Sequence, residues 1–246
     1  MPYRRLPNTD AARIRAMKVA LAKGRELPPF KLAYSSKTFV RLQAFLPSFE
    51  NAYSMQRQSM AIQVKSNREY QEVLKKARLY IGHFMRVMNM AAQRGDIRKD
   101  CFDFYGLTNG NSSLPMLTGE KDIIYWGEKI IEGEAKRLRA GRTPVTNPTI
   151  AVVKVHFEKF QDAHQFQKTL NRKTSDYVAG IAKMRKEADE IILSIWNEVE
   201  NYFANIEEEL RRKEAEKYGL VYVFRKSELE KIEMGPPTDI SRENIA

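Results

Sequence analysis

The residues that could hold a metal ion or catalyse a reaction are few, and they begin with three histidines. A di-iron helical bundle needs a glutamate three residues before its histidine ligand. The residues three positions before His83, His156 and His164 are Tyr80, Val153 and Gln161. His156 and His164 lie eight residues apart, with no cysteine and no ligand on a second helix apparent for zinc. We therefore predict no metal site and expect both histidines at interior or boundary positions of one helix.

A nucleophile and a phosphate-binding loop are equally hard to find. The single cysteine, Cys101, has Asp100 and Asp103 beside it, and their charges disfavour a thiolate. Gly119-Glu120-Lys121 lacks the preceding glycines and the following Ser or Thr of a P-loop, so it predicts the first turn of a helix. The sequence thus predicts no catalytic residue and no cofactor, and we expect a non-enzymatic protein.

Basic residues are concentrated in the first part of the chain. Residues 1–100 carry 20 lysines and arginines against 7 acidic residues, whereas residues 101–246 carry 22 against 24. In the helix expected from Arg68, the residues Arg68, Lys75 and Arg86 point away from the core within a narrow arc, with Arg78 beside them. Phosphates would suit such a row. No helix-turn-helix, RRM or zinc signature accompanies it, so a solvated surface is the simpler interpretation.

The same predicted helix has a second apolar side. Its core side centres on Ala77, Phe84 and Met88. Four residues lie nearly opposite this core side, at spacings of 4, 3 and 4 residues: Leu79, His83, Arg86 and Met90. Such spacing resembles that of the contact positions in a coiled coil. Two interpretations stay open. The helix expected from residue 10 or from residue 119 covers this side, or a second copy or another protein binds there.

An internal repeat organises the chain. The stretch Phe49–Arg57 recurs 111 residues later as Phe160–Lys168, sharing the pattern Phe-x-x-Ala-x-x-x-Gln. Tyr105-Gly106-Leu107 likewise recurs as Tyr218-Gly219-Leu220. In between, apolar residues fall at matching positions. The sequence therefore predicts two related units, about 37–107 and 148–220.

Each unit is expected to be a pair of helices. In the first unit Pro47 should kink the helix or start a new one, and Ser66 with Glu69 fits a capping box. In the second unit Asn147-Pro148 starts a helix, and a break is expected near residues 173–176. Strand-like alternation appears only at residues 220–224.

Two helical hairpins with one apolar face each would bury those faces against each other. We therefore predict a mainly α protein with one domain over 1–246, a pseudo-symmetric four-helix bundle with accessory helices at about 10–24 and 119–140. Gln56 and Gln167 fall on the two core stripes, where they either meet in the interior or touch water at its edge. The tail 235–246 is expected to be disordered.

Composition bounds the location of the protein. One cysteine precludes an internal disulfide framework. The amino terminus has no apolar run resembling a signal peptide, and no apolar stretch approaches the roughly 20 residues that span a bilayer. We expect a cytoplasmic protein without a membrane partner.

Four stretches resemble an uncharacterised group of bacterial helical proteins of similar length. They are Pro2–Asp10, Tyr105-Gly106-Leu107, Trp126–Glu134 and Asn147–Ala151. The resemblance covers nearly the whole chain. It implies no activity and no functional residues.

Three functional hypotheses follow. The first is a binding or scaffold protein that pairs with itself or with another protein through Leu79, His83, Arg86 and Met90. The alternative is sequence-nonspecific nucleic-acid binding through Arg68, Lys75, Arg78 and Arg86. A third, an enzyme with a site under the 103–119 connection, rests only on the observation that long loops are often functional.

Overall fold

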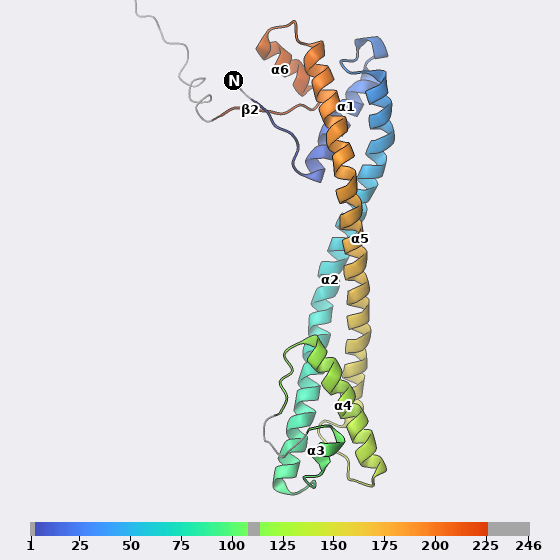
Figure 1. The fold of residues 1–246 in the computed structure, drawn as a ribbon, viewed down its shortest axis with the longest axis vertical. Coiled ribbons are helices and arrows are strands. Elements are labelled where there is room, and N and C mark those ends of the chain that lie inside the picture. Colours follow the sequence, from blue (N-terminus) through green and yellow to red (C-terminus); the bar gives the residue numbers. More distant parts are fainter. Residues whose placement is uncertain (1–2, 108–113, 226–246) are drawn as a thin grey trace, which may run out of the picture. The chain divides into compact units, whose positions relative to one another are not determined.

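The computed structural model describes residues 3–107 and 114–225, and 76% of these are helical. This confirms the mainly α class. Figure 1 labels the six α-helices of the described residues and β2. In chain order the elements are β1 (Tyr3–Arg4), α1 (Asp10–Glu26), a 3₁₀ turn (Pro29–Lys31), α2 (Ser36–Arg94), α3 (Cys101–Phe104), α4 (Glu120–Arg139), α5 (Ile150–Tyr202), α6 (Glu208–Glu216) and β2 (Tyr222–Val223).

The predicted breaks within the repeat units do not occur. Helix α2 continues through Pro47 and Ser66, and α5 continues through Thr174. The four shorter helices of the predicted bundle are therefore two long ones. The reason is visible at the expected caps, because the Ser66 hydroxyl donates to Gln167 on α5 and Thr174 is hydrogen-bonded to Ser59 on α2. These side chains join two helices instead of capping their own.

The chain divides into two compact units. Unit 1 contains residues up to Gln56 and from Tyr177 onward, and unit 2 contains Arg57–Asp176. Each unit therefore takes one part of α2 and one part of α5. These boundaries cut across the repeat, since each unit combines the start of one repeat with the end of the other.

Unit 1 packs α1 against the first part of α2 and the last part of α5. Its hydrophobic core includes Met17, Leu42, Phe49, Ile192 and Trp196. The predicted helix at 10–24 corresponds to α1, whose first turn is capped by the Thr9 hydroxyl accepting from the Ala12 N–H. The alternating stretch 220–224 contains β2, which pairs antiparallel with β1, so that Tyr3 is opposite Val223.

Unit 2 packs α3 and α4 against the last part of α2 and the first part of α5. Its core includes Ile81, Phe84, Ile123 and Phe160. The predicted helix at 119–140 corresponds to α4. Helix α4 approaches α5 closely at Gly127, where an added Cβ would lie 2.3 Å from the Phe157 ring.

The repeated Tyr-Gly-Leu sequence has the same local structure in both units. Tyr105 and Tyr218 are buried, and the glycines after them have φ angles of +69° and +88°. Only glycine adopts this left-handed conformation at little cost. The motif thus follows the end of α3 in unit 2 and the end of α6 in unit 1. The predicted disordered tail, 235–246, lies outside the described residues.

Candidate interaction surfaces

The predicted partner face lies on α2 in unit 2 and is open to solvent. Leu79 is 56% exposed and Met90 47%, and His83 and Arg86 are exposed between them. The interpretation that α1 or α4 covers this face is wrong. Helix α4 packs into the core of unit 2 instead, where Ile123 is buried and Gly127 approaches Phe157 of α5. The interpretation that a partner binds here remains a hypothesis.

The basic row on the same helix is also exposed, but only part of it is free to bind. Arg68 and Lys75 form no ion pair with any residue that the structure describes. Arg78 donates to the Thr118 carbonyl at 3.0 Å, and Arg86 donates to the Gly82 carbonyl at 3.1 Å. The four side chains are therefore not one uniform phosphate-binding row.

A buried charged network that the sequence did not reveal holds α3 and α4 together. Glu134 and Arg137 are at most 1% exposed, and two hydrogen bonds of 2.8 and 2.9 Å join them. The Tyr105 hydroxyl donates to Glu134, and the Val145 N–H donates to the other carboxylate oxygen at 3.0 Å. Burial alone would raise the pKa of Glu134, but the hydrogen bonds from Arg137, Tyr105 and Val145 outweigh it and lower that pKa.

This network is structural rather than catalytic. Its donors and acceptors satisfy one another, and no described buried side-chain N or O atom lacks a hydrogen-bond partner. A substrate cannot reach the carboxylate without opening the unit. The local signal in the sequence is weak, because Glu134 and Arg137 are three residues apart, a spacing common on solvated helices.

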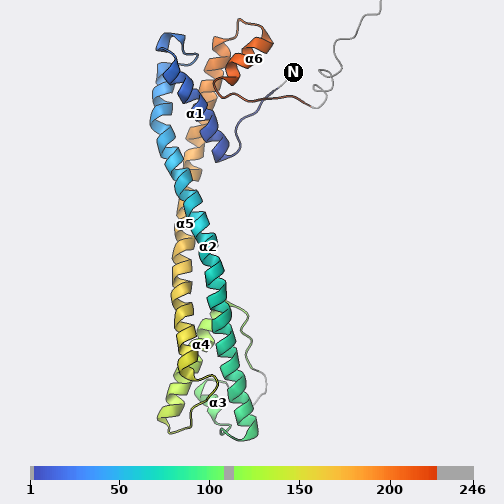
Figure 2. The ribbon, with the colours of Figure 1, turned by 180° about the vertical axis from the view of Figure 1, so that it is seen from behind.

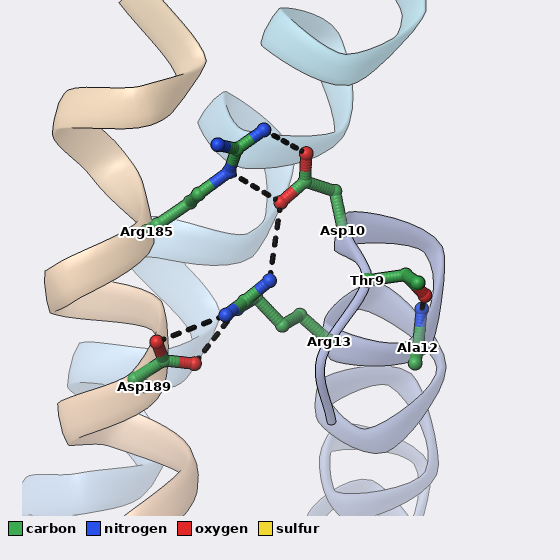
Figure 3. Close-up of polar contacts among 6 residues, drawn as sticks. All are labelled: Thr9, Asp10, Ala12, Arg13, Arg185 and Asp189. Atoms are coloured by element: carbon green, nitrogen blue, oxygen red, sulfur yellow. Dashed lines mark hydrogen bonds and ion pairs between the residues drawn. The ribbon is translucent and has the colours of Figure 1, made fainter. Parts of the chain in front are cut away.

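Unit 1 contains a second charged cluster, at the start of α1 (Figure 3). Both oxygens of Asp10 accept from Arg185 on α5, at 2.9 and 2.8 Å. Arg13, one turn further along α1, is held by Asp189 on α5 at 2.7 and 3.1 Å. Beside the cluster lies a cleft of about 450 Å³ that Asn8 and Tyr53 also line. The four charges are mutually paired, so the cluster fixes α1 on α5.

A ladder of polar side chains joins α2 and α5 in unit 2. Ser59 bonds with Thr174 at 2.7 Å, Gln63 donates to Asn171 at 2.8 Å, and Ser66 donates to Gln167 at 3.1 Å. A fourth level brings Tyr70 within 3.2 Å of His164. The bonds define an antiparallel register, in which residue numbers fall along α5 as they rise along α2. The amide of Gln167 is thus used within unit 2, by Ser66 and Asn171.

The remaining candidate residues are placed as follows. Cys101 is buried, and burial raises the pKa of its thiol, with Asp100 adding to that effect. His156 stacks on Tyr80, and His164 contacts Tyr70 and Glu120. Within residues 3–107 and 114–225, no group of three or more His, Cys, Asp or Glu side chains is arranged to hold a metal ion.

Two further tests concern the class of protein. None of the helices in the described part of the chain is both long and apolar enough to cross a membrane. No family model, curated protein or solved structure matches the chain. The resemblance to bacterial helical proteins therefore stays a prediction.

Proposed function

We propose that the protein is a non-enzymatic helical scaffold that binds another protein through Leu79, His83, Arg86 and Met90. The observation that carries this proposal is the exposure of Leu79 and Met90, 11 residues apart, on a helix whose other side is buried. Exposed apolar side chains in a row, with charge at their margin, are typical of surfaces that bind a partner helix.

Charge favours an acidic partner over a second copy of the chain. Residues 57–94 of α2 carry eight lysines and arginines and two glutamates. Pairing this face with itself would place Lys75, Arg78 and Arg86 near their own copies, and such like-charge contacts oppose association. A helix with an apolar stripe and flanking carboxylates would complement both the apolar and the basic residues.

The test is site-specific photo-crosslinking in cells. A crosslinking residue replaces His83, and a matched control replaces Val64, which is 74% exposed on the same helix. We expect an adduct with an acidic protein at position 83 only, and its loss when Arg86→Glu is added. A crosslink to the chain itself, or equal adducts at position 64, would contradict the proposal.

Nucleic-acid binding is the second candidate, favoured by the free ammonium and guanidinium groups of Lys75 and Arg68. Binding of a random duplex or single strand should then weaken steeply with salt. The double variant Arg68→Gln/Lys75→Gln should reduce the slope of log affinity against log salt by roughly 1.4 to 1.8. Absence of binding at low salt would end this candidate.

We also propose that the two units are related structures produced by the repeat. The support is their matched composition: α1 corresponds to α4, α6 to α3, and each core contains one copy of the Phe-x-x-Ala pattern, at Phe49 and at Phe160. In this correspondence each unit is built from both repeats. Unit 1 combines the first part of α2 with the last part of α5, and unit 2 combines the last part of α2 with the first part of α5.

A further inference from the structure

An aromatic pair links α2 and α5 in unit 2. The rings of Tyr80 and His156 stack with centroids 4.0 Å apart and planes 11° from parallel, and both side chains are half-buried. Phe157, the next residue on α5, packs against α4. Successive residues are about 100° apart around a helix, so His156 is turned away from α4. Figure 2 shows the side of the α2 and α5 pair of unit 2 that is turned away from α4, which lies behind the pair in this view.

Two lysines, one on each helix, lie about one turn from this aromatic pair. The helix register pairs 70 with 164 and 80 with 156. Lys76 on α2 therefore falls opposite Lys159 on α5. Both are exposed, and neither forms an ion pair with a residue in the described part of the chain. Burial first, and then the charges of Lys159 and Lys76, lower the pKa of His156 below 6.5.

Packing alone does not require these residue types. In the sequence repeat, positions 80 and 156 correspond to Ile191 and Phe45 in unit 1, which are both buried and apolar. Position 76 corresponds to Glu187, whose carboxylate is paired with Arg41 at 3.6 Å. Position 159 corresponds to the uncharged Ser48. Unit 1 thus has an ion pair and no lysine at these two positions, whereas unit 2 has two unpaired lysines near an imidazole among its described residues.

We propose that Lys76, His156 and Lys159, supported by Tyr80, form a binding site for a phosphate group. Two ammonium groups and an imidazole N–H supply donors from both helices, and stacking on Tyr80 holds the imidazole ring in place. A phosphate dianion matches the two lysine charges and stabilises a protonated His156. The phosphate can belong to a small molecule or to a nucleic-acid backbone. The site adjoins the predicted Leu79–Met90 face on α2, but the proposal does not rest on a partner binding to that face.

The experiment is NMR titration of the three histidines in the full-length protein, at constant ionic strength set with sodium chloride. Adding inorganic phosphate, and in a second arm tripolyphosphate, should raise the pKa of His156 by roughly 1. His83 and His164 are internal references and should not move. Lys76→Gln/Lys159→Gln should abolish the phosphate effect, whereas Lys129→Gln/Lys168→Gln, which removes the same charge elsewhere, should preserve it.

Further arms distinguish the source of the phosphate from other anions. A response to a single-stranded oligonucleotide that is lost in the Lys76/Lys159 variant assigns the site to nucleic acid, and a response to tripolyphosphate alone assigns it to small molecules. Polyglutamate at equal charge should have little effect. The proposal is overturned if polyglutamate acts equally, if all three histidines shift together, or if the His156 pKa does not respond.

Discussion

Units 1 and 2 secure corresponding helices by different means. In unit 1 the start of α1 is fixed by Asp10 and Arg13, whose partners Arg185 and Asp189 are each about 40% exposed on their side chains. In unit 2 α4 is fixed by Glu134 and Arg137, which have almost no contact with solvent. Ion pairs at a surface stabilise weakly, whereas a buried charge depends entirely on its partner. Unit 2 should therefore tolerate substitution at its charged cluster far less well.

The largest difference is expected for Glu134→Ala. This change leaves the Arg137 guanidinium buried without a counter-charge, and it should lower the free energy of unfolding by about 3 to 5 kcal/mol. Hydrogen exchange resolved by segment should show faster exchange in α3 and α4 than in α1. Adding Arg137→Met should recover part of the loss, because no uncompensated charge then remains. Equal effects in both units would contradict the comparison.

The next largest difference between the two units is expected for glycine substitutions, measured as the change in the free energy of unfolding. A Cβ at Gly133 would lie 2.5 Å from the Tyr105 ring and 2.7 Å from the Phe104 carbonyl oxygen. Gly133→Ala should therefore cost roughly 1 to 3 kcal/mol in urea denaturation. Gly180→Ala in unit 1 is the matched control, because nothing lies within 4 Å of the added Cβ. It should stabilise by about 0.5 to 1 kcal/mol.

Asp10→Asn should have a smaller effect, about 1 kcal/mol, because Arg185 is 40% exposed and Arg13 keeps its two bonds to Asp189. Exchange should accelerate in α1 and not in α4. Asp189→Asn, at a more exposed carboxylate, should cost less. A loss comparable to that of Glu134→Ala would show that the cluster in Figure 3 is more than a surface anchor.

The smallest expected effect is the loss of stability when the pH is lowered. The pKa of Glu134 is lowered in the folded protein, so its ionised form contributes stability above the ordinary value of 4.5. That contribution is lost as the pH falls below 4.5 and through the lower folded value. Denaturation curves from pH 6 to pH 4 should show the first part of this decline, in unit 2. Glu134→Gln should remove this component of the slope.

The positions of the helices in the sequence were more predictable than the contacts between them. Apolar spacing and the Thr9 cap are local signals, and they located α1 and α4 within two residues. The capping box at Ser66 is also a local signal, but it was misleading. Its hydroxyl bonds to Gln167, 101 residues away, and such a partner is not visible in a short window of sequence.

The charged cluster in unit 2 shows the same limit. Glu134 and Arg137 are three residues apart, like many pairs on solvated helices. Their burial depends on Tyr105 and Val145, which come from other segments. The predicted partner face was chosen by its spacing, and two of its residues, Leu79 and Met90, are exposed. The stack of Tyr80 on His156 requires the register of two antiparallel helices, which periodicity does not provide.

Cys101 gives unit 2 a chemical reporter of its own opening. It is the only cysteine in the chain, it is 2% exposed, and it lies in α3 beside the Glu134 network. A thiol reagent such as iodoacetamide can modify it only when this part of unit 2 opens. The alkylation rate of the unmodified protein therefore reports how often this part of unit 2 opens, without a label or a designed mutation.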